Sequence, residues 1–243
     1  MIDTIFAPGQ YADAPLFLST AHLLSIGILL ILLVLLYLHR HKPYMQSFGR
    51  YALISLLILS EVSFLAWTVL SGIWDVRFHL PAQLCTISLF ICIYMLITRQ
   101  SFIFEIVYFF GLAGALQAII TPDLFYTFPH YCFFHFFIAH TAIILAILYM
   151  VWVEKYRITW KSALKSFAAL NVIALLVFFI NVLTGANYMF LAHKPEGPSI
   201  LDFLGPYPLY IFQLEFIALF MYGLLYVPFL LVKKSSHQKQ GAD

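Results

Sequence analysis

Charged residues are scarce in this chain of 243 residues, because only 10% are Asp, Glu, Lys or Arg while 63% are hydrophobic. Soluble domains carry about 25% charged residues, so the composition excludes an ordinary soluble globular protein. Only three cysteines are present, which excludes a disulfide framework as the source of stability. No Lys or Arg precedes the first apolar run, so we expect no cleavable signal peptide.

Long apolar runs, in contrast, recur along the whole sequence. Each is long enough to cross a hydrocarbon core of about 30 Å as a helix, and none shows the alternation of a strand. The sequence therefore predicts an all-α, polytopic transmembrane bundle that forms one domain over residues 1–232, followed by a disordered cytoplasmic tail at 233–243. The seven predicted spans are 16–38, 51–71, 80–98, 102–120, 131–152, 162–184 and 207–232.

Basic residues indicate how this bundle is oriented. Of the 13 Lys and Arg residues, only Arg77 and Lys194 fall on one side of the seven predicted spans. The positive-inside rule places the cation-rich side in the cytoplasm. We therefore expect the N-terminus outside, the C-terminus in the cytoplasm, and a multi-pass protein of the cell membrane. The cations on the predicted cytoplasmic side are Arg40, Lys42, Arg50, Arg99, Lys155, Arg157, Lys161, Lys165, Lys233, Lys234 and Lys239.

Polar side chains are concentrated in the outer and middle parts of the predicted spans. Intramembrane carboxylates cost about 3 kcal/mol each on insertion scales, so we expect Glu61 and Glu215 to face inward and to have partners. This asymmetry predicts a polar chamber that opens toward the outer leaflet. The predicted chamber residues are Glu61, Gln83, Cys85, Gln117, His130, His135, His140, Asn181, Gln213 and Glu215.

Three histidines occur in the stretch FPHYCFFHFFIAH at 128–140. His140 is the deepest of them, and it lies about 140° around the helix from His135. Two interpretations of His140 stay open: a general base, or a structural hydrogen bond to Glu61 or Glu215. His130 and His135 fit interfacial, supporting positions. The spacings among the three histidines, five, five and ten residues, do not match metal-ligand pairs on a helix, so we expect no metal and no cofactor.

Cys85 allows two interpretations as well. A thiolate activated by a nearby imidazole is a nucleophile, whereas a small apolar side chain is simply suited to contacts between helices.

Several blocks of the sequence resemble the YwaF family of bacterial integral membrane proteins. These blocks are LPAQLC at 80–85, FGLAGALQAIITPDL at 110–124, FPHYCFFHFFIAH at 128–140, NYMFLAHKP at 187–195 and SILDFLGPYPLY at 199–210. That family is similar, more distantly, to a vertebrate transmembrane acyltransferase of ether-phospholipid remodelling and to the androgen-induced hydrolases of fatty-acid esters. The resemblance implies a catalytic histidine at His140 and a cysteine nucleophile near Ala82 or Cys85.

Two classes of function follow. The first is a lipid-directed acyltransferase or ester hydrolase with His140 as base. Its nucleophile is Cys85, water or a lipid hydroxyl, and Gln83 or Gln117 donates to the oxyanion. The second is a transporter or receptor that binds a small polar ligand in the same chamber. We expect membrane phospholipids or fatty-acyl esters as partners, and no nucleic acid.

Overall fold

The computed structural model describes residues 5–9, 16–124, 126–195 and 200–240. In these ranges the regular structure is entirely helical, as predicted. The elements are α2 (Thr20–His39), the π-helix η1 (Met45–Gly49), α3 (Arg50–Leu70), α4 (Leu84–Thr98), α5 (Ser101–Ile120), α6 (Tyr131–Trp152), α7 (Trp160–Thr184), the 3₁₀ turns η2 (Tyr188–Phe190) and η3 (Ile200–Phe203), and α8 (Leu209–Gln240).

Six of these helices are long and apolar enough to cross a membrane: α2, α3 with η1, α5, α6, α7 and α8. Their outer faces are strongly apolar, as Leu70 and Leu183 illustrate with exposed fractions of 86% and 85%. Apolar surface on that scale is what lipid covers in a membrane protein. The chain is therefore a multi-pass membrane protein.

The predicted span at 80–98 is the one that differs most from the structure. Its helix, α4, begins only at Leu84 and has 15 residues, about 22 Å of helix. The delay has a local cause: Ala82 N–H donates to Leu80 O at 2.8 Å in a tight turn around Pro81, and Gln83 is the N-cap. Seven crossings thus remain a prediction, because α4 by itself is shorter than a hydrocarbon core of about 30 Å.

The other predicted ranges agree with the helices to within a few residues, apart from the C-terminal one. α2 starts at Thr20 rather than at 16 because Ser19 caps it, accepting a hydrogen bond from His22 N–H. α8 continues to Gln240, into the segment for which the sequence predicts disorder. Adding residues to an existing helix costs less than nucleating a new one, which accounts for this continuation. Residues 241–243 lie outside the described part of the chain.

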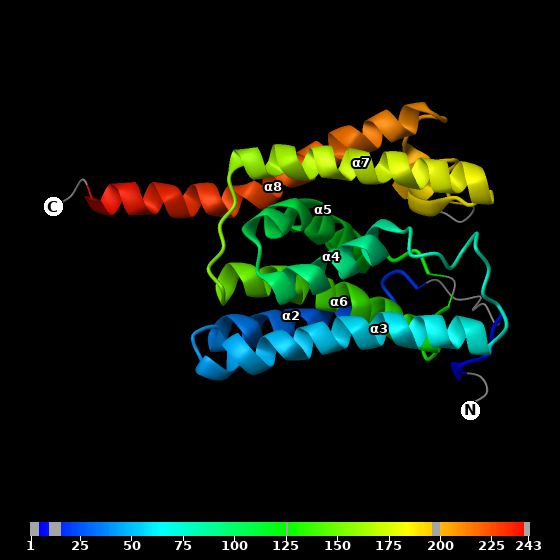
Figure 1. Ribbon diagram of the computed structural model, residues 1–243, viewed down its shortest axis with the longest axis horizontal. Coiled ribbons are helices and arrows are strands. Elements are labelled where there is room, and N and C mark those ends of the chain that lie inside the picture. Colours follow the sequence, from blue (N-terminus) through cyan, green and yellow to red (C-terminus); the bar gives the residue numbers. More distant parts are fainter. Residues whose placement is uncertain (1–4, 10–15, 125, 196–199, 241–243) are drawn as a thin grey trace.

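α6 is the central helix, since 72% of the residues in its most apolar stretch are buried. It packs against α2, α3, α4 and α5, while α7 and α8 pack on α5 (Figure 1). The connections gather at two ends of the bundle. We call the end with residues 40–50, 99–100 and 153–159 the basic end, and the end with 71–83, 121–124, 126–130, 185–195 and 200–206 the histidine end. The described N-terminal residues and the C-terminal end of α8 lie at opposite ends (Figure 1).

Candidate functional site

His140 lies in α6 with 7% of its surface exposed. Its Nδ1 is 2.6 Å from the carbonyl oxygen of Phe136, one turn earlier in the same helix. Because a carbonyl oxygen can only accept, Nδ1 must carry the proton, and the neutral ring then has its lone pair on Nε2. No hydrogen bond joins that Nε2 to any residue in the described ranges. The helix thus holds His140 in the tautomer whose unprotonated nitrogen is Nε2.

The carboxylates that the sequence pairs with His140 lie elsewhere. Glu215 on α8 accepts a hydrogen bond from Asn171 Nδ2 on α7 at 3.1 Å. Glu61 on α3 is half-buried, and no described residue forms an ion pair or hydrogen bond with it. The predicted pairing with Glu61 or Glu215 is therefore wrong: a backbone carbonyl inside α6 meets His140 instead, since a helix offers every i−4 carbonyl at close range.

His135 lies on the side of α6 that faces α3. Its ring stacks on Phe64 of α3, with ring centroids 4.4 Å apart and planes at 11°. Its Nε2 is fully buried without a hydrogen-bond partner among the described residues, and so is Ser60 Oγ on α3. One turn nearer the histidine end, Tyr131 Oη donates to Ser63 Oγ at 2.7 Å. The α3–α6 contact therefore carries a polar strip, and sequence reasoning missed its serines because Ser is common at helix contacts.

Three of the predicted amides hold the backbone of the loop between α7 and α8. Gln83 Oε1 accepts from Met189 N–H at 3.0 Å, and Gln213 Oε1 accepts from Gly205 N–H at 2.7 Å. Asn181 binds Tyr188 twice, since its Oδ1 accepts from the N–H and its Nδ2 donates to the carbonyl, both at 2.9 Å. Tyr188 Oη in turn donates to Val76 O at 2.7 Å. These contacts give the amides a structural role at the histidine end.

Gln117 and Cys85 are separate from that network. Gln117 Nε2 donates to Thr121 Oγ1 within the last turn of α5, at 2.5 Å. Cys85 is a half-buried free thiol in the first turn of α4. No hydrogen bond joins its Sγ to His140, although α4 and α6 pack against each other. The structure thus does not bring a complete Cys–His pair within hydrogen-bonding distance.

His130 and His22 are fixed at both ring nitrogens. His130 caps α6 through Nδ1, which accepts from Cys132 N–H at 3.1 Å, and its Nε2 lies 3.2 Å from Ala7 O. His22 Nδ1 accepts from Leu18 N–H at 3.0 Å, and its Nε2 lies 2.8 Å from Ile119 O. Both rings therefore serve as backbone clamps. Within the part of the chain that the structure describes, no three His, Cys, Asp or Glu side chains are grouped as a metal site needs.

The clamp at His130 predicts a pH effect on the segment 5–9. Burial lowers the pKa of His130 from its ordinary value of 6.5, and the hydrogen bond to Ala7 O opposes this in part. As the pH falls, His130 therefore takes up its proton in the unfolded state before it does so in the folded state. The stabilisation that neutral His130 gives to the folded state is full above about pH 6.5 and is lost as the pH falls through the lower folded-state pKa. We expect the amides of residues 5–9 to be better protected from hydrogen exchange at pH 7.5 than at pH 5, after correction for intrinsic exchange rates. The variant His130→Ala should show no such dependence, and an unchanged dependence there would contradict the assignment.

Two cavities occur at the basic end. One has a volume of about 280 Å³ and the other of about 560 Å³. Neither is lined by a histidine or by any other residue of the predicted chamber.

Comparison with known proteins places the chain in a family. No curated protein and no solved structure matches it. The profile of the TMEM164 family matches residues 17–226, which is most of the chain and includes α2 to α7 and the first half of α8. The narrower resemblance to the YwaF family stays a prediction. Since the match covers far more than half of its length, this membrane protein belongs to the TMEM164 family.

Proposed function

We propose that this protein is a lipid-directed acyltransferase or ester hydrolase in which His140 acts as the general base. The observation that carries the proposal is the hydrogen bond from Nδ1 to Phe136 O, because it leaves the lone pair of Nε2 available to accept a proton. An unpaired polar atom is costly in hydrocarbon, and a nucleophile that donates its proton to Nε2 would offset that cost.

The proposed chemistry is acyl transfer to a nucleophile. His140 Nε2 takes the proton from the nucleophile, whose S or O atom bonds to the acyl carbonyl carbon. The tetrahedral intermediate then expels the alcohol oxygen of the ester, which receives the proton back from His140. With Cys85 as nucleophile, a second attack by water or by a lipid hydroxyl releases the acyl group. With water or the hydroxyl as first nucleophile, one attack suffices.

The start of α4 supplies donors for the oxyanion. Gln83 is the N-cap, but its side chain makes no capping hydrogen bond, so the N–H groups of the first turn stay available. The side-chain oxygen Oε1 of Gln83 accepts from Met189 N–H, which leaves the side-chain NH₂ group of Gln83 free to donate. Gln117 is less suited, because its NH₂ group already donates to Thr121. Cys85 lies two residues after Gln83, on a helix that packs against α6.

We further propose that the chain crosses the membrane seven times with its N-terminus outside, so that α4 crosses in addition to the six longer helices. The histidine end would then face the outer leaflet, and the polar chamber there would take up a phospholipid headgroup or a fatty-acyl ester while the acyl chains lie against phenylalanines of α6. The support is the excess of cations at the opposite end.

Labelling with a membrane-impermeant maleimide in intact cells tests this orientation. We expect Phe203→Cys to react, since Phe203 is 91% exposed at the histidine end, and Lys161→Cys at the basic end to react only after lysis. The unmodified protein provides the background from its three cysteines. The reverse pattern would place the chamber in the cytoplasmic leaflet.

The activity itself is tested with the purified full chain in lipid nanodiscs that contain a phospholipid labelled on its acyl group. We expect labelled free fatty acid or a labelled second lipid to form. Cys85→Ala separates the mechanisms: loss of product with a normal unfolding temperature supports an acyl-cysteine, whereas retained product leaves water or a hydroxyl as the nucleophile. No product from the unsubstituted protein, together with saturable binding of a small polar ligand, would favour a transporter or receptor.

A further inference from the structure

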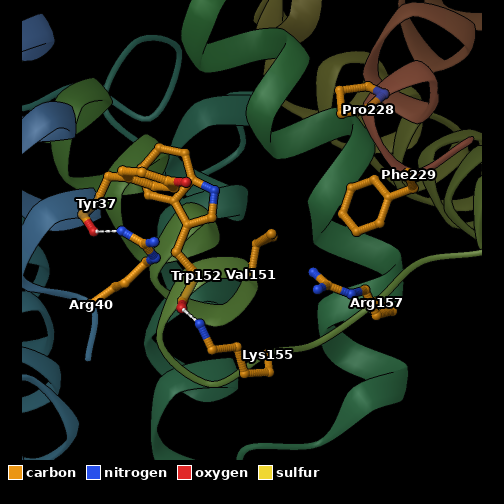
Figure 2. A pocket seen from close by; sticks show the side chains of 8 residues that line it. All are labelled: Tyr37, Arg40, Val151, Trp152, Lys155, Arg157, Pro228 and Phe229. Atoms are coloured by element: carbon orange, nitrogen blue, oxygen red, sulfur yellow. Dashed lines mark hydrogen bonds between the residues drawn. The ribbon is translucent and has the colours of Figure 1, made fainter. Parts of the chain in front are cut away.

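The smaller cavity at the basic end is lined by cations from two separate parts of the chain. Arg40 follows the last residue of α2, while Lys155 and Arg157 lie in the connection between α6 and α7. Figure 2 shows the three charged groups around the same opening, with Trp152 and Phe229 on its walls. Lys155 and Arg157 are exposed and Arg40 is half-exposed, so a ligand can reach all three.

No carboxylate in the described ranges forms an ion pair with these cations. The ion pairs of the described residues join Arg77 to Asp75, Arg99 to Glu154, and Lys165 to Glu105. The cations of the cavity are absent from all three pairs. Burial lowers the pKa of Lys155, and the charges of Arg40 and Arg157 lower it further. The charge of Lys155 is also the largest cause of the lowered pKa of His41, ahead of burial and of Arg40. The cavity is therefore a site where like charges repel one another.

Capping of helix C-termini explains only part of this arrangement. Arg40 donates to Tyr37 O of α2, and Lys155 donates to Trp152 O of α6. Cations stabilise helix C-termini, so these two contacts have a structural reason. A guanidinium has five N–H donors and an ammonium three, however, and most of them remain unused. Arg157 has no hydrogen bond to any described residue, and its guanidinium lies 5.9 Å from the Phe229 ring centroid. Lys155 moreover has φ +65°, a conformation that residues other than glycine rarely adopt.

The walls of the cavity are apolar and aromatic. Tyr37 and Trp152 meet edge to face, with centroids 5.4 Å apart. The larger cavity shares Arg157 and Phe229 with the first and adds Lys161 and Tyr226. A soluble anion needs only the charges, whereas a phospholipid also uses apolar walls that continue into the lipid-facing surface.

From the cavity, its three cations without an ion pair to a described residue and its aromatic walls, we propose that the basic end holds a specific site for the phosphate headgroup of an anionic phospholipid. A phosphate monoester such as that of phosphatidic acid fits three cations best, because it carries up to two negative charges. This site is separate from the proposed catalytic His140 and does not depend on it.

Binding of fluorescent phosphatidic acid to the purified full chain in neutral detergent tests the proposal. We expect tighter binding than for phosphatidylcholine with the same acyl chains. One cation near an anionic headgroup strengthens binding about fivefold. We therefore expect about fivefold weaker binding for each single variant, Arg40→Gln, Lys155→Gln and Arg157→Gln, and about 100-fold weaker binding for the triple variant. Lys42→Gln is the matched control, since Lys42 is exposed at the same end and lines neither cavity.

Three results would overturn the proposal: equal binding of both lipids, unchanged binding by the triple variant, or an equal loss in Lys42→Gln. Displacement of the lipid by glycerol 3-phosphate at similar concentration would also overturn it, in favour of a soluble phosphate ester. If the triple variant does not fold, Arg157→Gln alone decides, because it removes no hydrogen bond between described residues.

Discussion

Replacing His140 by Ala is expected to lower the rate of acyl transfer or ester hydrolysis by about 10²- to 10⁴-fold, the usual loss when a general base is removed. The protein should still fold, because the only hydrogen bond of the imidazole to a described residue is to Phe136 O, whose helix remains intact without it. The measurement is the initial rate of product formation from acyl-labelled phospholipid in nanodiscs, per folded molecule, as a function of pH. The pH dependence that reports deprotonation of the base should disappear in the variant.

His22→Ala is the matched control for this experiment. His22 is as buried as His140, with 1% of its surface exposed, but both of its ring nitrogens contact backbone groups. We expect this variant to unfold at a lower temperature and to retain its rate per folded molecule. If His140→Ala instead behaves like His22→Ala, then His140 is a structural residue and the proposed enzyme loses its base.

Much of the helical architecture can be predicted from the sequence, because lipid imposes it. Polar backbone groups in hydrocarbon must pair within their own segment, so a long apolar run becomes a helix. The predicted range 131–152 coincides with α6, and 102–120 differs from α5 by one residue. The start of α4 was missed because Pro81 and the turn at Leu80–Ala82 are local effects that an apolar run does not report.

The site could be predicted less well, because hydropathy gives the depth of a side chain but not its neighbour. The depth of a residue in the predicted spans placed His140 and Asn181 in the same predicted chamber. The structure distinguishes them: His140 has a ring nitrogen without a described partner, whereas both polar atoms of Asn181 bind Tyr188. The basic cavity was missed for the same reason. The sequence assigned Arg40, Lys155 and Arg157 to one side, but only the fold brings residues 40 and 155 to one opening.

The distinction between Asn181 and His140 leads to a stability prediction. Asn181 is 4% exposed and Tyr188 is 1% exposed, and the two hydrogen bonds between them pair both backbone groups of Tyr188. Asn181→Leu keeps a similar volume but leaves a buried N–H and a buried C=O without these partners. Tyr188 O still accepts from Leu191 N–H at 3.4 Å, so the buried N–H of Tyr188 is the group that is orphaned. Since such a group costs about 1–3 kcal/mol, we expect a loss of that size in the free energy of unfolding. The measurement is thermal unfolding in detergent, supported by denaturant titration.

Asn171→Leu is the comparison variant, since Asn171 is exposed on the same helix and its amide donates to Phe167 O and to Glu215. Removing it orphans no buried group, so we expect a change below about 1 kcal/mol. The loop that Asn181 holds is also joined to the start of α4, because Met189 N–H donates to Gln83 Oε1. We therefore expect Asn181→Leu to increase hydrogen exchange at Tyr188–Leu191. If Asn181→Leu unfolds like the unsubstituted protein but forms less acyl product, then Asn181 contacts the substrate and its bonds to Tyr188 are dispensable.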